Sequence, residues 1–229
     1  MKITWFGHSA FRLDMDGASV LIDPFLTGNP VNKTSVEDAS KGVSHVVLTH
    51  GHDDHIGDTA AICKATDATL VAVYEICTHL GGQGVKNVEY ANTGGTIRLP
   101  AFDVTFVRAD HSSSSGGVYL GNPCGVVIRS KRENKSVYHM GDTDIFGDMA
   151  LINEIHKPDV GIVPMGDRFT MGPKTAALAC QRFFAFKTIL PCHYKTFGLL
   201  EQSAQPFVEA LGKDGSKVKV IDPGQSIEV

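Results

Sequence analysis

The order of apolar and polar positions predicts strands over much of the first fifty residues. Apolar and polar residues alternate at positions 3–6, 10–14 and 18–22, with turn residues before the last segment, and this pattern is typical of a meander. A short apolar run at residues 43–48 then predicts a strand that is buried on both faces. This strand leads directly into a segment that is rich in histidine.

The rest of the chain alternates between helix-like and strand-like segments. We expect helices at residues 56–65, 74–80, 148–156 and 173–184. We expect further strands at residues 68–73, 96–99, 102–108, 117–120, 125–130, 136–139, 160–164, 188–190, 218–220 and 226–229. The strands fall into two groups, each followed by helices, and no low-complexity linker divides the chain. The pattern therefore predicts a single α/β domain over residues 1–229.

The composition excludes some classes of partner. Hydrophobic residues make up 42% of the 229 residues and charged residues 20%, which is ordinary for a globular protein with a sizeable core. The net charge is −4, whereas nucleic-acid-binding proteins usually carry a basic stripe. The densest basic run, residues 129–135, is interrupted by Glu133, and we interpret it as a solvated hairpin turn. We therefore expect no nucleic-acid partner.

The sequence also bears on where the protein works. No apolar stretch approaches the roughly 18 residues of a membrane span, and residues 1–8 lack the pattern of a signal peptide. The five cysteines are scattered without C-x-x-C spacing, which favours free, mostly buried thiols in a reducing compartment. We therefore expect a cytoplasmic protein with no membrane contact. Its oligomeric state is open, and a homo-oligomer is compatible with the sequence.

The histidine-rich segment carries the strongest chemical signal. Residues 50–55 read His-Gly-His-Asp-Asp-His and follow the end of a buried strand, where ligands collect in α/β folds. A solvated polar loop is the plain alternative. However, three imidazoles and two carboxylates in six residues need partners if they are buried, and metal ions provide them. Imidazole together with carboxylate favours a borderline divalent metal.

Three more candidate ligands lie at other predicted strand ends. His111 follows the strand at 102–108, Asp142 follows the strand at 136–139, and His193 follows the strand at 188–190. Any one of them alone would be interpreted as an ordinary buried or capping residue. Three in the same setting, after a ligand-rich string, indicate one metal centre.

The order of these residues resembles the metallo-β-lactamase superfamily of metal hydrolases. The superfamily's H-x-H-x-D-H motif, followed by His, Asp and His, is matched at every position. The resemblance implies a four-layer αββα sandwich, in which two mixed sheets are flanked by helices. It also implies two metal sites: His50, His52 and His111 for the first, and Asp54, His55 and His193 for the second, with Asp142 between them.

Flanking phrases are similar to a narrower branch of metal-dependent hydrolases, related to L-ascorbate-6-phosphate lactonase. The phrases are GHSAF at 7–11, DPFLTGNP at 23–30, FTMGP at 169–173 and PCHYKTF at 191–197. The likeness covers residues 2–229. The sequence departs from it at Lys174, where an acidic residue usually follows the proline, and this puts a substrate contact at that position in doubt.

The resemblance implies hydrolysis of a small ester, lactone or phosphodiester by a hydroxide that bridges two divalent metals. Asp54 is the carboxylate that would accept a proton during attack. Zinc suits the histidine-rich set best, and manganese and iron fit it too. Alternatives are a metal-dependent nuclease or RNA-processing phosphodiesterase, and a di-iron redox or metal-sensing protein.

Three further residues are candidates for supporting roles. Asp23 is expected to orient the histidine-rich loop, against a plain turn residue as the alternative. His8 either lines the substrate pocket or forms a hydrogen bond in the core. Arg168 either clamps an anionic group of the substrate or lies on the surface. The serine run at 112–115 is interpreted as a loop near the site, and Cys192 as a buried thiol.

Overall fold

The computed structural model describes residues 1–229 and contains two large β-sheets. The first sheet has seven strands, and its parallel part runs from β3 to β6. In spatial order its strands are β15 (Ser226–Glu228), β1 (Lys2–Trp5), β2 (Phe11–Met15), β3 (Ala18–Ile22), β4 (His45–Val47), β5 (Thr69–Val73) and β6 (Val88–Ala91).

The second sheet has six strands and is also mixed, because β12, β13 and β14 are parallel while the others pair antiparallel. Its spatial order is β14 (Thr188–Cys192), β13 (Val160–Pro164), β12 (Ser136–His139), β11 (Cys124–Ser130), β8 (Phe102–Arg108) and β7 (Thr96–Arg98). A separate hairpin pairs β9 (Ser114–Ser115) with β10 (Val118–Tyr119).

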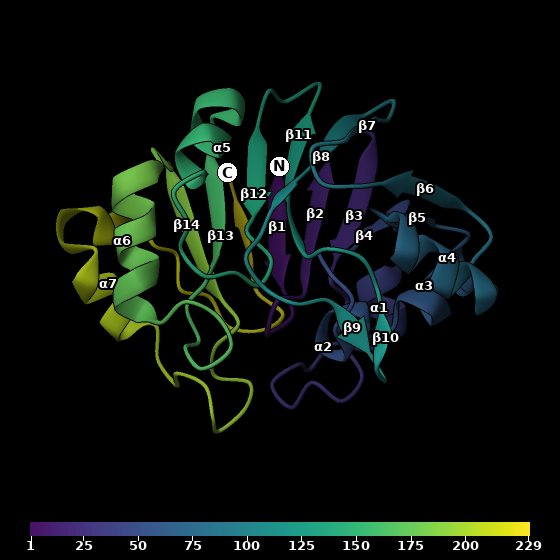
Figure 1. Ribbon diagram of the computed structural model, residues 1–229, viewed down its shortest axis with the longest axis horizontal. Coiled ribbons are helices and arrows are strands. Elements are labelled where there is room, and N and C mark those ends of the chain that lie inside the picture. Colours follow the sequence, from purple (N-terminus) through teal and green to yellow (C-terminus); the bar gives the residue numbers. More distant parts are fainter.

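Helices cover the outer side of each sheet (Figure 1). Beside the first sheet lie α1 (Val36–Ser40), α3 (Thr59–Thr66) and α4 (Tyr74–Gly82). Beside the second lie α5 (Met149–His156), α6 (Pro173–Phe183) and α7 (Gln205–Ala210), followed by the 3-10 helix η1 (Gly212–Lys217). The short helix α2 (Asp53–Ile56) lies at the edge of the sandwich. The expected αββα sandwich with two mixed sheets is confirmed.

The apolar pattern of the strands explains why the two sheets pack together. Every residue of β13 is buried, as are four of the five residues of β3, β5 and β14, so their side chains meet neighbours on both faces. These strands contribute to one hydrophobic cluster of 60 buried residues. That continuous core fixes the position and orientation of the two sheets relative to each other.

Strand direction places the chemistry at one edge of this core. The parallel pairs β3–β4 and β12–β13–β14 align their carboxyl ends, and β1 and β8 run in the same directions as β3 and β12. The loops that follow these strands therefore gather at the lower edge of the sandwich in Figure 1. This is the edge at which open α/β sheets bind ligands.

Three details of the elements differ from those predicted. The helix expected at 56–65 is divided into α2 and α3 at Gly57, whose φ is +42° and whose Cβ, if present, would lie 2.4 Å from the Pro24 carbonyl oxygen. The strand expected at 218–220 is wrong, because only one bridge forms, between Ile189 and Val218. Helices α1 and α7 were missed because each has only five or six residues, too few to show a periodicity.

The five cysteines are all free and buried, as expected from their scattered positions. Burial raises the pKa of the Cys63 and Cys77 thiols to about 12, so these groups are protonated and behave as apolar side chains. Every helix of the structure is too short or too polar to cross a bilayer.

The packing of the core predicts different effects for two isoleucines. Ile162 in β13 has no exposed surface, whereas Ile155 in α5 is 70% exposed. Replacing Ile162 with alanine should lower the free energy of unfolding by about 2–5 kcal/mol, because a cavity is left in the core. Replacing Ile155 with alanine should change it by less than about 0.5 kcal/mol. Urea unfolding followed by circular dichroism measures both, and equal effects would contradict the packing described here.

Candidate metal centre

The candidate ligands come from loops that follow different strands of both sheets. The loop after β4 and the helix α2 that follows it contribute four of them: His50, His52, Asp54 and His55. The remaining candidates follow β1, β3, β8, β12 and β14: His8, Asp23, His111, Asp142 and His193. The sandwich thus brings residues that are up to 185 positions apart in the sequence to one edge, since residues 8 and 193 lie in the same cluster.

Asp142 lies at the centre of this cluster. Its Oδ2 atom is 3.0 Å from His193 Nε2, 3.4 Å from His55 Nε2, 3.6 Å from His111 Nε2 and 4.0 Å from His50 Nε2. The side chain of Asp142 is only 2% exposed. One buried carboxylate oxygen therefore faces the Nε2 atoms of four imidazoles.

Two groups of potential ligand atoms surround this carboxylate. His50, His52 and His111 form one, and His8, Asp54, His55 and His193 form the other; the ligand atoms in each group lie within 4.8 Å of one another. The structure thus brings together all seven predicted ligands: His50, His52, Asp54, His55, His111, Asp142 and His193. It also places His8 in the second group, where the sequence left its position open.

Asp23 orients two of the histidines. Its Oδ2 accepts a hydrogen bond from His55 Nδ1 at 2.7 Å and another from the Thr49 hydroxyl at 2.6 Å. The Thr49 backbone N–H donates to Oδ1 at 2.8 Å. Because the Thr49 hydroxyl proton is used, its oxygen accepts from His50 Nδ1, which is 3.0 Å away. In the neutral form of each imidazole the lone pair is then on Nε2, and this atom lies 3.4 Å (His55) or 4.0 Å (His50) from Asp142 Oδ2.

The charges of the cluster are strongly coupled. Burial acts to lower the pKa of His55, but the negative charges of Asp142 and Asp23 outweigh it and raise that pKa well above its usual value. Burial acts to raise the pKa of Asp142, but His193 and His55 hold it well below its usual value. The buried carboxylates thus require positive charge beside them.

Other imidazoles in the cluster favour the neutral form, which is the form that binds metals. Burial lowers the pKa of His50 well below its usual value, and repulsion from His55 adds to this effect. The pKa of His8 is lowered to about 4, first by burial and then by repulsion from His193. Neutral imidazoles with bare nitrogens beside ionised carboxylates are a donor set for a divalent cation.

Unsatisfied buried atoms test whether such cations fit. His55 Nε2, His193 Nδ1 and Asp142 Oδ1 are buried without a hydrogen-bond partner. Buried polar atoms normally have partners, since leaving one unpaired costs about 1–3 kcal/mol. All three atoms belong to Asp142 or to the two imidazoles whose Nε2 atoms lie nearest to its Oδ2. The donor set therefore fits metal ions.

The backbone around the cluster adopts conformations that most side chains avoid. His8, Asp23 and His193 have φ values of +53°, +46° and +54°. At Gly166, in the loop after β13, a Cβ would lie 1.7 Å from the His193 carbonyl oxygen, so only glycine fits there. Strain of this kind is concentrated at functional sites, where the surrounding structure holds it in place.

The serine run holds the histidine-rich loop. The Ser113 hydroxyl accepts from the Gly51 N–H at 3.0 Å and donates to the Leu120 carbonyl at 3.0 Å. Ser112 Oγ lies 3.2 Å from His52 Nε2, which leaves His52 Nδ1 directed at His50. The serines therefore lie near the site, as expected, and make specific contacts with the loop that carries the ligands.

Two residues of the C-terminal half pack in the core. The Cys192 thiol is fully buried, and burial raises its pKa well above the usual value, in agreement with a structural role. The ring of Tyr194 is stacked on that of Trp5 with centroids 5.5 Å apart, so this tyrosine packs in the interior.

Arg168 lies outside the cluster. It is exposed, has a φ of +50°, and its guanidinium lies over the ring of Phe169 at 5.9 Å. It forms no hydrogen bond or ion pair with the candidate ligands. The structure therefore leaves its suggested contact with an anionic substrate without a geometric basis.

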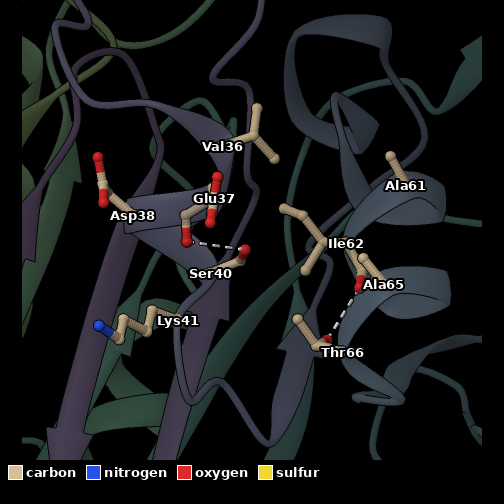
Figure 2. Close-up of a pocket in the computed structure, with 9 residues that line it drawn as sticks. All are labelled: Val36, Glu37, Asp38, Ser40, Lys41, Ala61, Ile62, Ala65 and Thr66. Atoms are coloured by element: carbon tan, nitrogen blue, oxygen red, sulfur yellow. Dashed lines mark hydrogen bonds between the residues drawn. The ribbon is translucent and has the colours of Figure 1, made fainter.

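A cavity of about 580 Å³ lies away from the candidate ligands, between α1 and α3 (Figure 2). Val36, Ile62 and two alanines form its apolar side, and Glu37, Asp38 and Lys41 lie along its rim. None of its lining residues belongs to the histidine cluster. This cavity is therefore separate from the candidate metal centre.

Sequence reasoning missed two threonines that orient the cluster. Thr49 links Asp23 to His50, and Thr196 Oγ1 lies 3.0 Å from His8 Nδ1. Thr49 directly precedes the His-x-His string and Thr196 follows His193 by three residues, so closeness in sequence was the available signal. Only the structure shows which nitrogen each threonine contacts.

Solved structures share this architecture. A metallo-hydrolase from the archaeon Ignicoccus hospitalis, Igni18, is 36% identical, with a TM-score of 0.89 over 99% of this chain and 97% of that protein. An isothiocyanate hydrolase from Delia radicum gut bacteria is 21% identical, with a TM-score of 0.81 over 100% of this chain and 99% of the other. The second likeness shows the fold alone.

Sequence comparisons cover the same length. Residues 2–193 match the model of the beta-lactamase superfamily domain. The chain is 57% identical to a UPF0173 metal-dependent hydrolase of Azorhizobium caulinodans, with 100% of both chains covered. It is 58% identical to the one of Methylocella silvestris, with 95% of both covered. The chain is a metal-dependent hydrolase and belongs to the beta-lactamase superfamily, together with these UPF0173 relatives.

Proposed function

We propose that this protein is a dinuclear metal hydrolase that acts on a small carbonyl-containing substrate, an ester or a lactone. The observation that carries the proposal is the position of Asp142 Oδ2, within 4.0 Å of the Nε2 atoms of His50, His55, His111 and His193. His50 and His111 belong to one group of potential ligands, and His55 and His193 belong to another. A carboxylate between two such groups is suited to bridge two cations.

The two groups define which residues would hold each metal. His50, His52 and His111 would hold the first, and Asp54, His55 and His193 the second, with Asp142 shared. Asp23 would orient His55 directly and His50 through Thr49. Such partners fix the ring orientation of metal-ligating histidines. Zinc suits this nitrogen-rich set, and manganese and iron also accept it.

When bound, two divalent metals supply Lewis acidity and a water whose pKa is lowered toward neutrality. The two central aspartates are suited to different tasks, because the Asp54 side chain is 33% exposed and that of Asp142 only 2%. Asp54 can reach substrate or solvent with its carboxylate, so it is the group that would hold a proton during the reaction. Asp142 is confined to holding metals.

The charges around the cluster favour a neutral electrophile over a phosphodiester. No lysine or arginine pairs with Asp23, Asp54 or Asp142, whereas phosphate-binding sites usually carry such side chains. Beside His8, the rings of Phe25 and Phe197 lie 6.3 Å apart, and Phe197 is 37% exposed. These rings would offer an apolar contact to the body of a small ester or lactone.

Removing the central carboxylate tests the dinuclear site. Asp142→Ala should lose both metals and all turnover, because four imidazoles lose their shared partner. Asp53→Asn is the matched control, since Asp53 is adjacent to Asp54 but its carboxylate contacts Ser115 instead of the cluster. Elemental analysis of purified protein should give about two equivalents for the parent chain and for Asp53→Asn. Two equivalents in Asp142→Ala would refute the assignment.

A milder change tests the role of Asp23. Asp23→Asn preserves the shape of the side chain but removes the charge that orients His55 and, through Thr49, His50. We expect metal affinity to fall about 10–100-fold, the range for partners of metal-ligating histidines. Competition with a chromophoric chelator measures the affinity. Unchanged affinity in a folded variant would show that Asp23 is only a turn residue.

Metal removal and a substrate panel test the reaction. Dialysis against a chelator should abolish turnover, and zinc or manganese should restore it, because the residues alone supply no nucleophile. The panel contains lactones, simple esters, phosphodiesters and an isothiocyanate. We expect metal-dependent turnover of a lactone or ester. Activity on phosphodiesters alone would overturn the preference for a neutral substrate, and full activity without metal would exclude a metallohydrolase.

A further inference from the structure

We propose that His8 is an additional ligand of the second metal, through its Nε2 atom. This inference rests on the proposed dinuclear site and extends its ligand set beyond the H-x-H-x-D-H pattern. His8 follows β1, near the N-terminus, and is far from His193 in the sequence. The centroids of the two rings nevertheless lie only 4.0 Å apart. His8 belongs to one group of potential ligands with Asp54, His55 and His193, and its Nε2 is the nitrogen that lies 3.0 Å from Asp54 Oδ2.

The contacts of the ring show which nitrogen faces the cluster. His8 Nδ1 lies 3.0 Å from Thr196 Oγ1, and Nε2 lies 3.0 Å from Asp54 Oδ2. The Thr196 hydroxyl donates to the Tyr194 carbonyl oxygen, which can only accept. The Thr196 oxygen is therefore left to accept from His8 Nδ1–H, and the Nε2 lone pair is directed at the Asp54 carboxylate.

Two acceptors that face each other at this distance need a positive charge between or beside them. A divalent cation held by both groups would meet this need, because a metal ligand must offer a lone pair that carries no proton. Thr49 makes the same pair of hydrogen bonds as Thr196, because its hydroxyl donates to Asp23 and accepts from His50 Nδ1. Two threonines therefore present two imidazoles to the cluster in the same way.

The backbone holds His8 in this position. Its carbonyl oxygen accepts from the Trp5 indole N–H at 3.0 Å and from the His193 backbone N–H at 3.1 Å. The second bond ties the end of β1 to the end of β14, so the two histidines are placed together. The left-handed φ of His8 makes this turn possible.

A hydrogen bond from His8 to Asp54 is the competing role, and glutamine separates the two. His8→Gln keeps an N–H donor close to the position of Nε2 but is a poor ligand for a transition metal. If His8 is a ligand, this variant should retain about one equivalent of metal where the parent chain retains two. If His8 only donates to Asp54, the variant should retain both.

The experiment compares the parent chain, His8→Gln, Thr196→Val and the control His45→Gln. His45 is a partly buried histidine of β4 outside the cluster, with Nδ1 bonded to Ser44. Each protein is loaded with zinc or manganese and dialysed, and its metal content is measured by elemental analysis. Circular dichroism and the thermal midpoint report folding, and the affinity of the weaker site is measured by chelator competition.

We expect two equivalents for the parent chain and for His45→Gln, and about one for His8→Gln. Thr196→Val keeps the ring but removes its acceptor, so the weaker site should lose about 10–100-fold in affinity. This variant decides the matter if His8→Gln fails to fold. A folded His8→Gln with two equivalents at unchanged affinity would overturn the role of His8 alone. Fewer than two equivalents in the parent chain would instead overturn the dinuclear function.

Discussion

The burial of the Asp142 carboxylate among imidazoles is the constraint on which the site depends. A carboxylate that is 2% exposed has lost nearly all contact with water, and desolvation of this kind is costly unless positive charge replaces it. Four Nε2 atoms surround it, and the Nδ1 hydrogen bonds of His50 and His55 direct two of those atoms toward it. Metal ions would satisfy the carboxylate and the lone pairs of neutral imidazoles together.

The packing of the two sheets stabilises this arrangement of buried charged and polar side chains. Ligand loops follow strands of both sheets, and the hydrophobic cluster of 60 residues holds the sheets in one relation. The loops are also tied to one another: Asp23 binds the loop after β4, Ser113 binds Gly51, and His193 binds His8 through the backbone. Each of these hydrogen bonds fixes the backbone of a segment that carries candidate ligands. The stability of the hydrophobic core therefore offsets the free-energy cost of ordering the loops at the edge of the sandwich.

The candidate ligands could be recognised in the sequence because their signal is local and chemical. Histidines and aspartates in one six-residue string are rare, and the other ligands follow recognisable strands. The apolar pattern likewise identified most elements. The short helices α1 and α7 lacked a period, and the break at Gly57 depends on the Pro24 backbone of a distant loop. Close approach between distant segments leaves no pattern in a single sequence.

By itself the sequence determined the order of most elements, the types of candidate ligand and their positions directly after the ends of strands. Only the tertiary structure added His8 to the second group, because residue 8 meets residues 54, 55 and 193 through the order of the strands in two sheets. It also decided the tautomers, since Thr49 and Thr196 act through contacts with Asp23 and Tyr194. Residue type sets what a side chain can bind, but the neighbours that packing provides decide which of its atoms is free to do so.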